Sequence, residues 1–252
     1  MQGLLKSILG EYNYPTRHRL FELFAILSYF SFTGVVSYKV WGAMDGFSPF
    51  SATWIMLTSI LLAYVAADFV SGFVHWLGDT FGEPDWFFLG PAFIMPFRYH
   101  HVDPKDITHH DFIEVNGNSC IVLLLYLVPI YLLIPAQLGG WGFGLCCFSV
   151  WFAMFIFLTN QCHKWAHTEN PPPLIKRLQS WSLILSPENH NVHHTAPYKT
   201  YYCITSGWMN PVIERLHLWR ILEAGMSMLT GRDYSGKEHM PDAQVDEGGA
   251  AS

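Results

Sequence analysis

The chain has 252 residues, of which 51% are hydrophobic and only 13% are charged, and its formal net charge at pH 7 is -6. Soluble domains carry about 25% charged residues, so this composition excludes an ordinary soluble protein and favours an integral membrane protein. We expect a membrane-embedded chain without a nucleic-acid partner.

Four apolar segments are close to the roughly 20 residues that a helix needs to cross a hydrocarbon core. Each has aromatic residues near its ends, where amphipathic rings prefer to lie. The first segment is too long for a signal peptide and lacks a small-residue cleavage site, so we expect it to be retained. The predicted spans are residues 20–41, 53–77, 120–138 and 141–162, within a membrane domain of residues 20–230.

The Lys and Arg residues between these spans predict their orientation, because basic segments resist translocation. Bases lie before the first span, between the second and third, and after the fourth, whereas the other two connections have none. We therefore expect the N-terminal residues 1–19 and the C-terminus to be cytoplasmic. Residues 231–252, where acidic residues lie among Gly and Ala, are predicted to be a disordered tail.

Two further apolar stretches are too short to span. Residues 86–97 contain Gly90, Pro91 and Pro96, which favours an interfacial or re-entrant piece over a crossing helix. Residues 174–185 mix basic residues with Leu, Ile and Trp, as an amphipathic helix on the cytoplasmic surface would. The predicted fold is an all-α membrane protein with four transmembrane helices, interfacial helices and a cytoplasmic histidine-rich cap.

The second predicted span carries a stripe of ligand-type residues. Offsets of seven and eleven residues place Asp68, His75 and Asp79 on one helix face. A lone charge at mid-membrane costs about 2.5–3.5 kcal/mol, so Asp68 needs a partner. We expect its carboxylate to accept a hydrogen bond from a metal-bound imidazole, with a structural polar contact as the alternative. Asp79, nearer the surface, is a possible metal ligand.

Most of the 13 histidines fall into four clusters, each near the cytoplasmic end of a predicted span. A single histidine is more often a hydrogen-bonded surface residue than a ligand. Several clusters on one face would repel one another when protonated, whereas a metal accepts the lone pair of each neutral ring. Besides the stripe with His75, the clusters contain His100, His101, His109, His110 and Asp111; His163 and His167; and His190, His193 and His194.

The number and type of these candidates indicate the metal. A structural zinc site needs four ligands and often uses cysteine, but this chain has no CxxC pair. A zinc hydrolase of the HExxH kind would need Glu where Lys164 stands. Imidazole with carboxylate is typical of non-haem iron that works with oxygen. We therefore expect two metal ions, with iron preferred.

The spacing of His163 and His167, and HNVHH at residues 190–194, resemble the histidine boxes that hold two irons in membrane desaturases. Two boxes depart from that pattern, because Asp79 stands in place of a second histidine in HWLGD, and FRYHH lacks its first histidine. With these departures, the sequence resembles the Kua/CarF family of plasmanylethanolamine desaturases. The stretches that carry this resemblance are ADFVSGFVHW, PFRYHHVDP, ITHHDFIEVNG, HKWAHT and YYCITSGWMNP. The resemblance covers about residues 64–230.

The resemblance implies removal of two hydrogens from carbons 1 and 2 of the sn-1 alkyl chain of an ether phospholipid, giving the vinyl ether of a plasmalogen. It also implies two iron ions, O₂ as oxidant, and an external electron donor such as cytochrome b5 or a ferredoxin. Asp111 would be an acidic companion of the ligands, and His109 a neighbour only. The implied ligands are His75, Asp79, His100, His101, His110, His163, His167, His190, His193 and His194.

Four alternatives remain open at this point. The same boxes serve an acyl-chain desaturase of phospholipids or a membrane lipid hydroxylase. A membrane b-type cytochrome also uses paired histidines, and a non-catalytic scaffold or metal sensor would bind metal without changing any lipid. The host membrane is expected to be a bacterial inner membrane or the endoplasmic reticulum, with the metal site on the cytoplasmic side.

Overall fold

The computed structural model describes residues 14–87, 89–134 and 139–234. Within these ranges the chain is helical and contains no strand. It divides into two compact units. Unit 1 combines residues 1–67 with 110–161, and unit 2 combines residues 68–109 with 162–252.

Four helices of the described chain are long and apolar enough to cross a membrane, which confirms the predicted four-span fold class. The first three are α2 (Thr16–Ala43), α3 (Pro49–Thr80) and α6 (Phe112–Leu133). The fourth is α7 (Gly139–His167). Each of α2, α3 and α7 extends beyond its predicted span at both ends. Residues 135–138 of the third predicted span lie outside the described residues.

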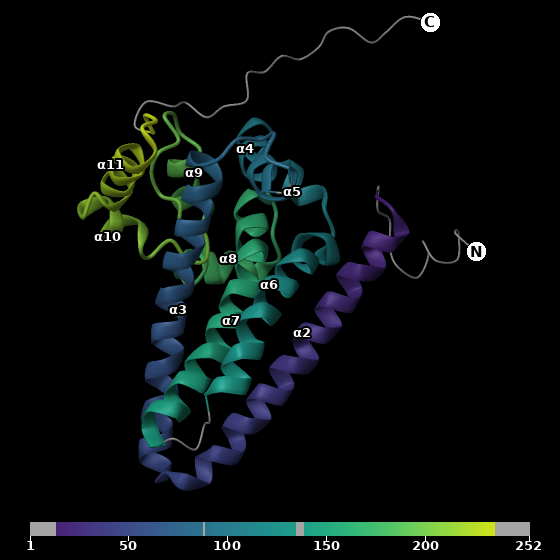
Figure 1. The fold of residues 1–252 in the computed structure, drawn as a ribbon, viewed down its shortest axis with the longest axis vertical. Helices are drawn as coiled ribbons and strands as arrows, with labels where there is room; N and C mark the ends of the chain where they lie inside the picture. Colours follow the sequence, from purple (N-terminus) through teal and green to yellow (C-terminus); the bar gives the residue numbers. More distant parts are fainter. Residues whose placement is uncertain (1–13, 88, 135–138, 235–252) are drawn as a thin grey trace, which may run out of the picture. The chain divides into compact units, whose positions relative to one another are not determined.

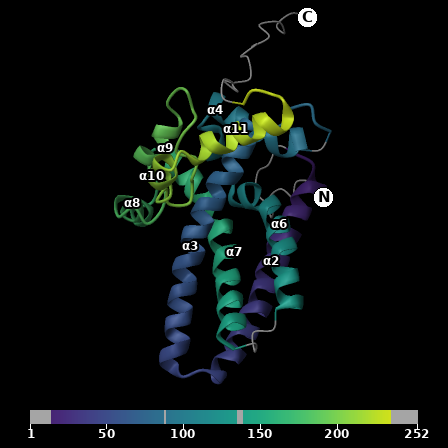
Figure 2. The same cartoon turned by 60° about the vertical axis from the view of Figure 1, so that its left-hand side comes forward.

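In unit 1, α2 and α6 lie side by side (Figures 1 and 2). Gly117 of α6 makes this close packing possible, because a Cβ atom there would lie 2.5 Å from the Cβ of Glu22 on α2. A real Cβ never approaches so closely, so any larger residue would push the two helices apart. We therefore assign Gly117 to helix packing rather than to flexibility.

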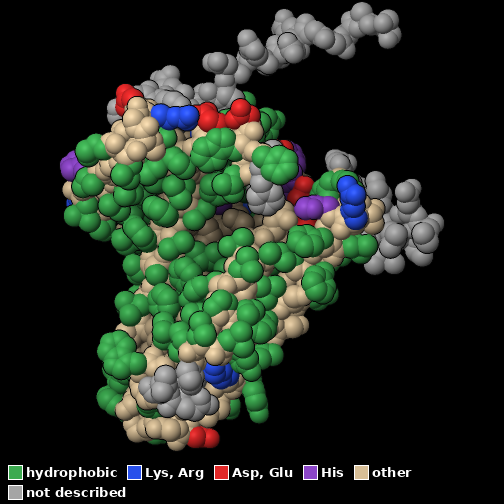
Figure 3. All heavy atoms as spheres, in the orientation of Figure 1, with side chains coloured by type: hydrophobic (Ala, Val, Ile, Leu, Met, Phe, Trp, Pro, Cys, Tyr) green, Lys and Arg blue, Asp and Glu red, His purple; other side chains and the backbone are tan. Residues whose placement is uncertain are grey.

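The outer faces of the long helices are apolar. Figure 3 shows hydrophobic side chains over these helices, with few Lys, Arg, Asp or Glu among them. Phe24, Leu61, Leu125 and Trp141 are among the exposed large hydrophobic residues. In water such a surface would be an aggregation liability, whereas in a bilayer the lipid tails cover it.

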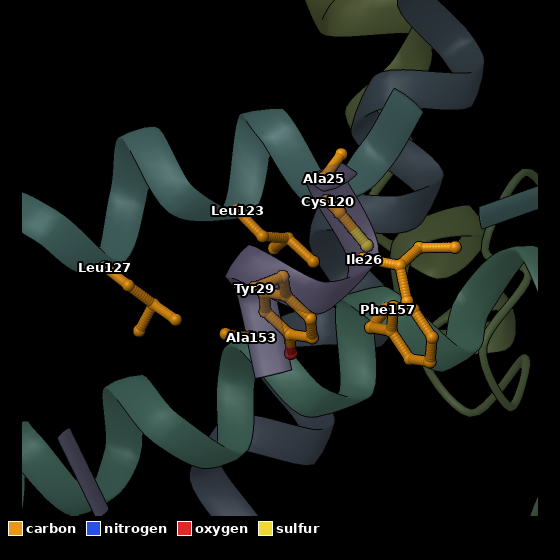
Figure 4. Packing of buried hydrophobic residues seen from close by; sticks show 8 residues of the cluster. All are labelled: Ala25, Ile26, Tyr29, Cys120, Leu123, Leu127, Ala153 and Phe157. Carbon is orange, nitrogen blue, oxygen red and sulfur yellow. The ribbon is translucent and has the colours of Figure 1, made fainter. Parts of the chain in front are cut away.

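The interior of unit 1 is a small apolar core contributed by three helices (Figure 4). Tyr29 of α2 stacks on Phe157 of α7, with ring centroids 5.4 Å apart. Cys120, Leu123 and Leu127 of α6 complete the contact. The small members of this core, Ala25 and Ala153, are of the kind that lets membrane helices approach closely.

Unit 2 surrounds the last turns of α3 and α7 with short helices. A π-helical turn at Gly90–Ile94 leads directly into α4 (Met95–Val102), so residues 90–97 of the apolar stretch are helical. The amphipathic stretch forms α8 (Pro173–Ser180), which is shorter than the predicted 174–185. The other short helices are α5 (Asp106–His109), α9 (Pro187–His193), α10 (Asn210–Arg215) and α11 (Leu218–Thr230).

A second apolar core fixes α10 and α11 to α3. The indole of Trp76 stacks on that of Trp219, with centroids 5.8 Å apart, and Tyr202 packs edge-on against Trp219. All three side chains are almost fully buried. After α11 the chain continues into residues 235–252, which carry most of the predicted tail and lie outside the described residues.

Candidate metal centre

Four helices supply the clustered histidines. His75 and Asp79 lie in the last turns of α3, and His163 and His167 in the last turns of α7. Both pairs are spaced i and i+4, which places the two side chains on one helix face. The remaining members come from α4 and from α9 with its C-cap, and they are His100, His101, His190, His193 and His194.

Five imidazoles form what we call the five-histidine group, in which the ligand atoms all lie within 4.8 Å of one another. The Nε2 atom of His167 lies 2.9 Å from the Nε2 atoms of both His100 and His190. It lies 3.3 Å from Nε2 of His163. The Nε2 atom of His194 lies 3.1 Å from that of His190.

Hydrogen bonding alone does not account for this arrangement. An imidazole nitrogen carries either one proton or one lone pair, so Nε2 of His167 can satisfy only one of its three close neighbours. Two nitrogens bound about 2.1 Å from one ion, at right angles to each other, are about 3 Å apart. The observed separations therefore fit a metal ion held by neutral imidazoles.

The second set, the aspartate–histidine group, is centred on one carboxylate oxygen. The Oδ2 atom of Asp79 lies 3.0 Å from Nε2 of His101. It lies 3.4 Å from Nε2 of His75 and 3.4 Å from Nε2 of His193. All four side chains are buried or nearly so. The group offers three imidazoles and one anionic oxygen, a donor set that suits a divalent transition metal.

Backbone carbonyls fix the orientation of two of these rings. The Nδ1 atom of His75 donates to the carbonyl of Tyr202 (3.1 Å), and Nδ1 of His193 donates to that of Thr200 (2.8 Å). The proton is thereby held on Nδ1, which leaves the Nε2 lone pair directed at Asp79. Both Nε2 atoms are buried and make no hydrogen bond, as expected where a metal takes the lone pair.

Three histidines outside the membrane-spanning helices have pKa values below the usual range for histidine, which favours the neutral ring. Burial lowers the pKa of His100, His190 and His194, and the positive charge that neighbouring histidines would carry lowers each pKa further. A neutral imidazole has a free lone pair, whereas a protonated one has none. Their surroundings therefore prepare these side chains for metal binding at neutral pH.

Asp68 does not accept a hydrogen bond from an imidazole, so that expectation is corrected. Its Oδ1 accepts backbone N–H groups of Ser206 (2.7 Å) and Gly207 (2.9 Å), and Oδ2 accepts that of Met209 (2.9 Å). Three amide donors satisfy a carboxylate that is fully buried. The alternative of a structural polar contact is the one observed, and it ties residues 206–209 to α3.

His110 and Asp111 belong to unit 1, and each has partners within that unit. The Nδ1 atom of His110 lies 2.8 Å from the carboxylate of Glu114, one helical turn further along. Asp111 caps the N-terminus of α6 by accepting the backbone N–H groups of Ile113 and Glu114, and it pairs with buried Arg19. Asp111 therefore stabilises the start of α6.

Sequence reasoning assigned no role to the backbone of Thr200 and Tyr202. Both residues orient imidazoles through their backbone carbonyl groups. Every residue has such a group, so residue identity does not reveal this role. Tyr198 and Tyr201 both adopt positive φ angles, 59° and 60°, which are uncommon for residues other than glycine. Such a conformation cannot be recognised from side-chain identity, so the sequence held no clear signal for it.

A model of the lipid desaturase domain matches residues 64–235, which is more than half of the chain. The chain is 46% identical over 220 residues to a plasmanylethanolamine desaturase of Myxococcus xanthus, a match that covers 86% of this chain and 75% of that protein. It is 42% identical over 187 residues to plasmanylethanolamine desaturase 1 of Mus musculus, covering 71% and 68%.

Plant relatives are more distant. Fatty acid desaturase 4 of Arabidopsis thaliana, a chloroplastic protein, is 33% identical over 162 residues, covering 64% of this chain and 48% of that protein. No solved structure matches the chain.

Proposed function

The chain belongs to the lipid desaturase family, and we propose that within it this protein forms the vinyl-ether double bond of plasmalogens. Its substrate would be plasmanylethanolamine, and the new bond would join carbons 1 and 2 of the sn-1 alkyl chain. The observation that carries the proposal is the similarity to two plasmanylethanolamine desaturases over most of the chain. The lipid desaturase domain at residues 64–235 includes both ligand groups.

We propose that each ligand group holds one iron ion. Bound iron together with O₂ would supply the oxidising power for breaking an unactivated C–H bond, which side-chain acids and bases lack. The chain's own contribution is positioning: the backbone carbonyls of Thr200 and Tyr202 hold two imidazoles in one tautomer, and α3, α4, α7 and α9 hold the ligands in place. We expect His110 to lie outside this set, since its partner is Glu114.

The reaction requires two electrons from a partner. Desaturation removes two hydrogen atoms from the lipid, and the reduction of O₂ to two water molecules needs two further electrons and two protons. We propose a protein donor such as cytochrome b5 or a ferredoxin. The distribution of Lys and Arg favours a cytoplasmic position for both ligand groups, both termini and the donor. The membrane would be a bacterial inner membrane or that of the endoplasmic reticulum.

A desaturase of phospholipid acyl chains is the second candidate, because the plant relatives are named fatty acid desaturases. Their lower identity, 33% against 46% and 42%, makes this the weaker candidate. A lipid hydroxylase would leave an added oxygen atom in the product, whereas a desaturase leaves none.

Lipid mass spectrometry tests the proposal directly. Cells that lack plasmalogens but contain their saturated ether precursor should form acid-labile vinyl ethers when they express this chain, and should not with an empty vector. Unchanged ether lipids accompanied by a new acyl double bond would favour the second candidate, and a mass increase of one oxygen atom would favour a hydroxylase.

A further inference from the structure

An open cavity of about 770 Å³ in unit 2 adjoins the ligand groups. His101, His167, His190 and His194 all contribute to its wall, so a molecule within it lies against both groups. A cavity of this volume lies within the range of sites that bind small molecules.

The rest of the wall carries charges of both signs. Lys105 contributes an ammonium group, and Asp103 and Glu188 contribute carboxylates. All three residues are exposed, so they can meet a ligand from solvent without first being uncovered. The cavity therefore combines the faces of metal ligands with a cation and two anions, a pattern that suits a zwitterion.

The proposed reaction limits how far the head group can lie from the metals, and this inference rests on that proposed function. Carbon 1 of the alkyl chain is joined to the phosphorus atom through the ether oxygen and the glycerol carbons. This path of about six bonds reaches about 7 Å when extended, like two extended residues. A head-group site must therefore adjoin the metal ligands themselves, which is where the charged cavity lies.

We propose that this cavity binds the phosphoethanolamine head group, with Lys105 contacting the phosphate and with Glu188 and Asp103 contacting the ammonium. A primary ammonium donates up to three hydrogen bonds, so it can contact both carboxylates. The trimethylammonium group of choline donates none. The site accordingly selects ethanolamine lipids over choline lipids.

Local contacts hold these side chains at the cavity. The ammonium of Lys105 pairs with the carboxylate of Glu169, which leaves further N–H groups for a phosphate because an ammonium has three. The Oδ1 atom of Asp103 accepts the backbone N–H of Lys105 (3.2 Å), which fixes the turn that carries both residues. Glu188 lies in the first turn of α9, two residues before the ligand His190.

Binding of soluble head groups tests the site without turnover. We would titrate the purified full-length chain, with and without iron, with glycerophosphoethanolamine, glycerophosphocholine and inorganic phosphate, using calorimetry. Glycerophosphoethanolamine should bind at least about tenfold more tightly than the other two probes, as expected for contacts between charged groups. Equal affinity for inorganic phosphate would mean an anion site only, and would overturn the proposal.

Variants then assign the contacts. Glu188→Gln and Lys105→Met should each weaken the binding of glycerophosphoethanolamine about tenfold, and Lys105→Arg should restore most of it. Asp45→Asn and Lys176→Met are matched controls, because both residues are exposed and lie outside the cavity wall. Wild-type affinity in Glu188→Gln and Lys105→Met would overturn the proposal.

Turnover separates this inference from the proposed function. In Glu188→Gln the KM for plasmanylethanolamine should rise about tenfold, and the preference over plasmanylcholine should shrink, while kcat changes less. If the wild-type chain forms no vinyl ether, the proposed function fails and the binding titrations still decide the head-group site. If it forms vinyl ethers and the variants keep wild-type KM and head-group preference, the head-group site fails alone.

Discussion

Among single residues, we expect each ring of the five-histidine group to be required for metal binding. His163→Ala or His194→Ala removes a nitrogen from a set whose members lie about 3 Å apart, so a bound ion would lose a ligand outright. We expect vinyl-ether formation to be abolished while membrane insertion is unchanged, measured by lipid mass spectrometry and by the amount of protein in membranes.

The matched control for these variants is His217. It lies outside both groups, and its backbone has φ 51°, a conformation that Asn tolerates better than Ala. His217→Asn should therefore retain activity close to wild type. Full activity in His163→Ala, or complete loss in His217→Asn, would contradict the assignment of ligands.

A substitution at Asp79 distinguishes the two ligand groups, because Asp79 belongs only to the aspartate–histidine group. Its Oδ2 lies within 3.4 Å of three imidazole nitrogens, so we expect it to bind metal directly. Asp79→Asn keeps the shape but removes the negative charge, and bound iron should fall by about half while activity vanishes. Elemental analysis of purified protein measures the iron. A decrease in activity of only about 10 to 100-fold with full iron content would instead place Asp79 outside the ligand set.

The sequence predicted candidate ligands where the prediction depended only on the spacing of residues within one helix. The two residues of each i and i+4 pair lie on one face of their helix. The pair on α3 belongs to one ligand group and the pair on α7 to the other. Spacing does not reveal what packs opposite a residue, so the contacts of Asp68 with residues 206–209 and of Asp111 with Arg19 could not be predicted from the sequence. The four spans could be predicted from the sequence because a long apolar segment in lipid forms a helix, in which its backbone groups hydrogen-bond within the segment.

At the scale of elements, Asp68 joins residues 206–209 to α3, and this join indirectly supports the metal site. The nearby carbonyl of Tyr202 orients His75, and the backbone N–H of Ile204 donates to Ser71, one turn along α3 from Asp68. A carboxylate that accepts three amide N–H groups should be worth several kcal/mol, since one hydrogen bond to a charged group contributes about 1.5–3 kcal/mol.

Asp68→Ala should therefore lower the unfolding temperature of detergent-purified protein and reduce its iron content, although Asp68 contacts no ligand. Asp45→Ala, which removes an exposed carboxylate from the turn after α2, serves as the control and should change neither quantity. Thermal unfolding and elemental analysis measure the two effects. Unchanged values in Asp68→Ala would mean that residues 206–209 hold their position without this carboxylate.

At the scale of the whole molecule, the two units depend differently on metal. Every member of the five-histidine and aspartate–histidine groups lies in unit 2, whereas unit 1 is stabilised by packing such as that of Tyr29 on Phe157. Two bound ions would join the last turns of α3 and α7 to α4 and α9 within unit 2, and binding energy of this kind is folding energy for the elements that are joined.

Removal of iron by a chelator should therefore loosen unit 2 and leave unit 1 unchanged. Without metal, the five-histidine group would be left with nitrogen contacts of 2.9–3.3 Å that cannot all be hydrogen bonds, which should weaken the packing of α4 and α9. Hydrogen exchange measures this: protection should fall in residues 95–102 and 187–209, should stay constant in residues 23–36 and 118–128, and should return when Fe²⁺ is restored. Equal loss of protection in both sets of residues would mean that metal stabilises the chain as a whole, and no loss in either would mean that the histidine groups hold their arrangement without an ion.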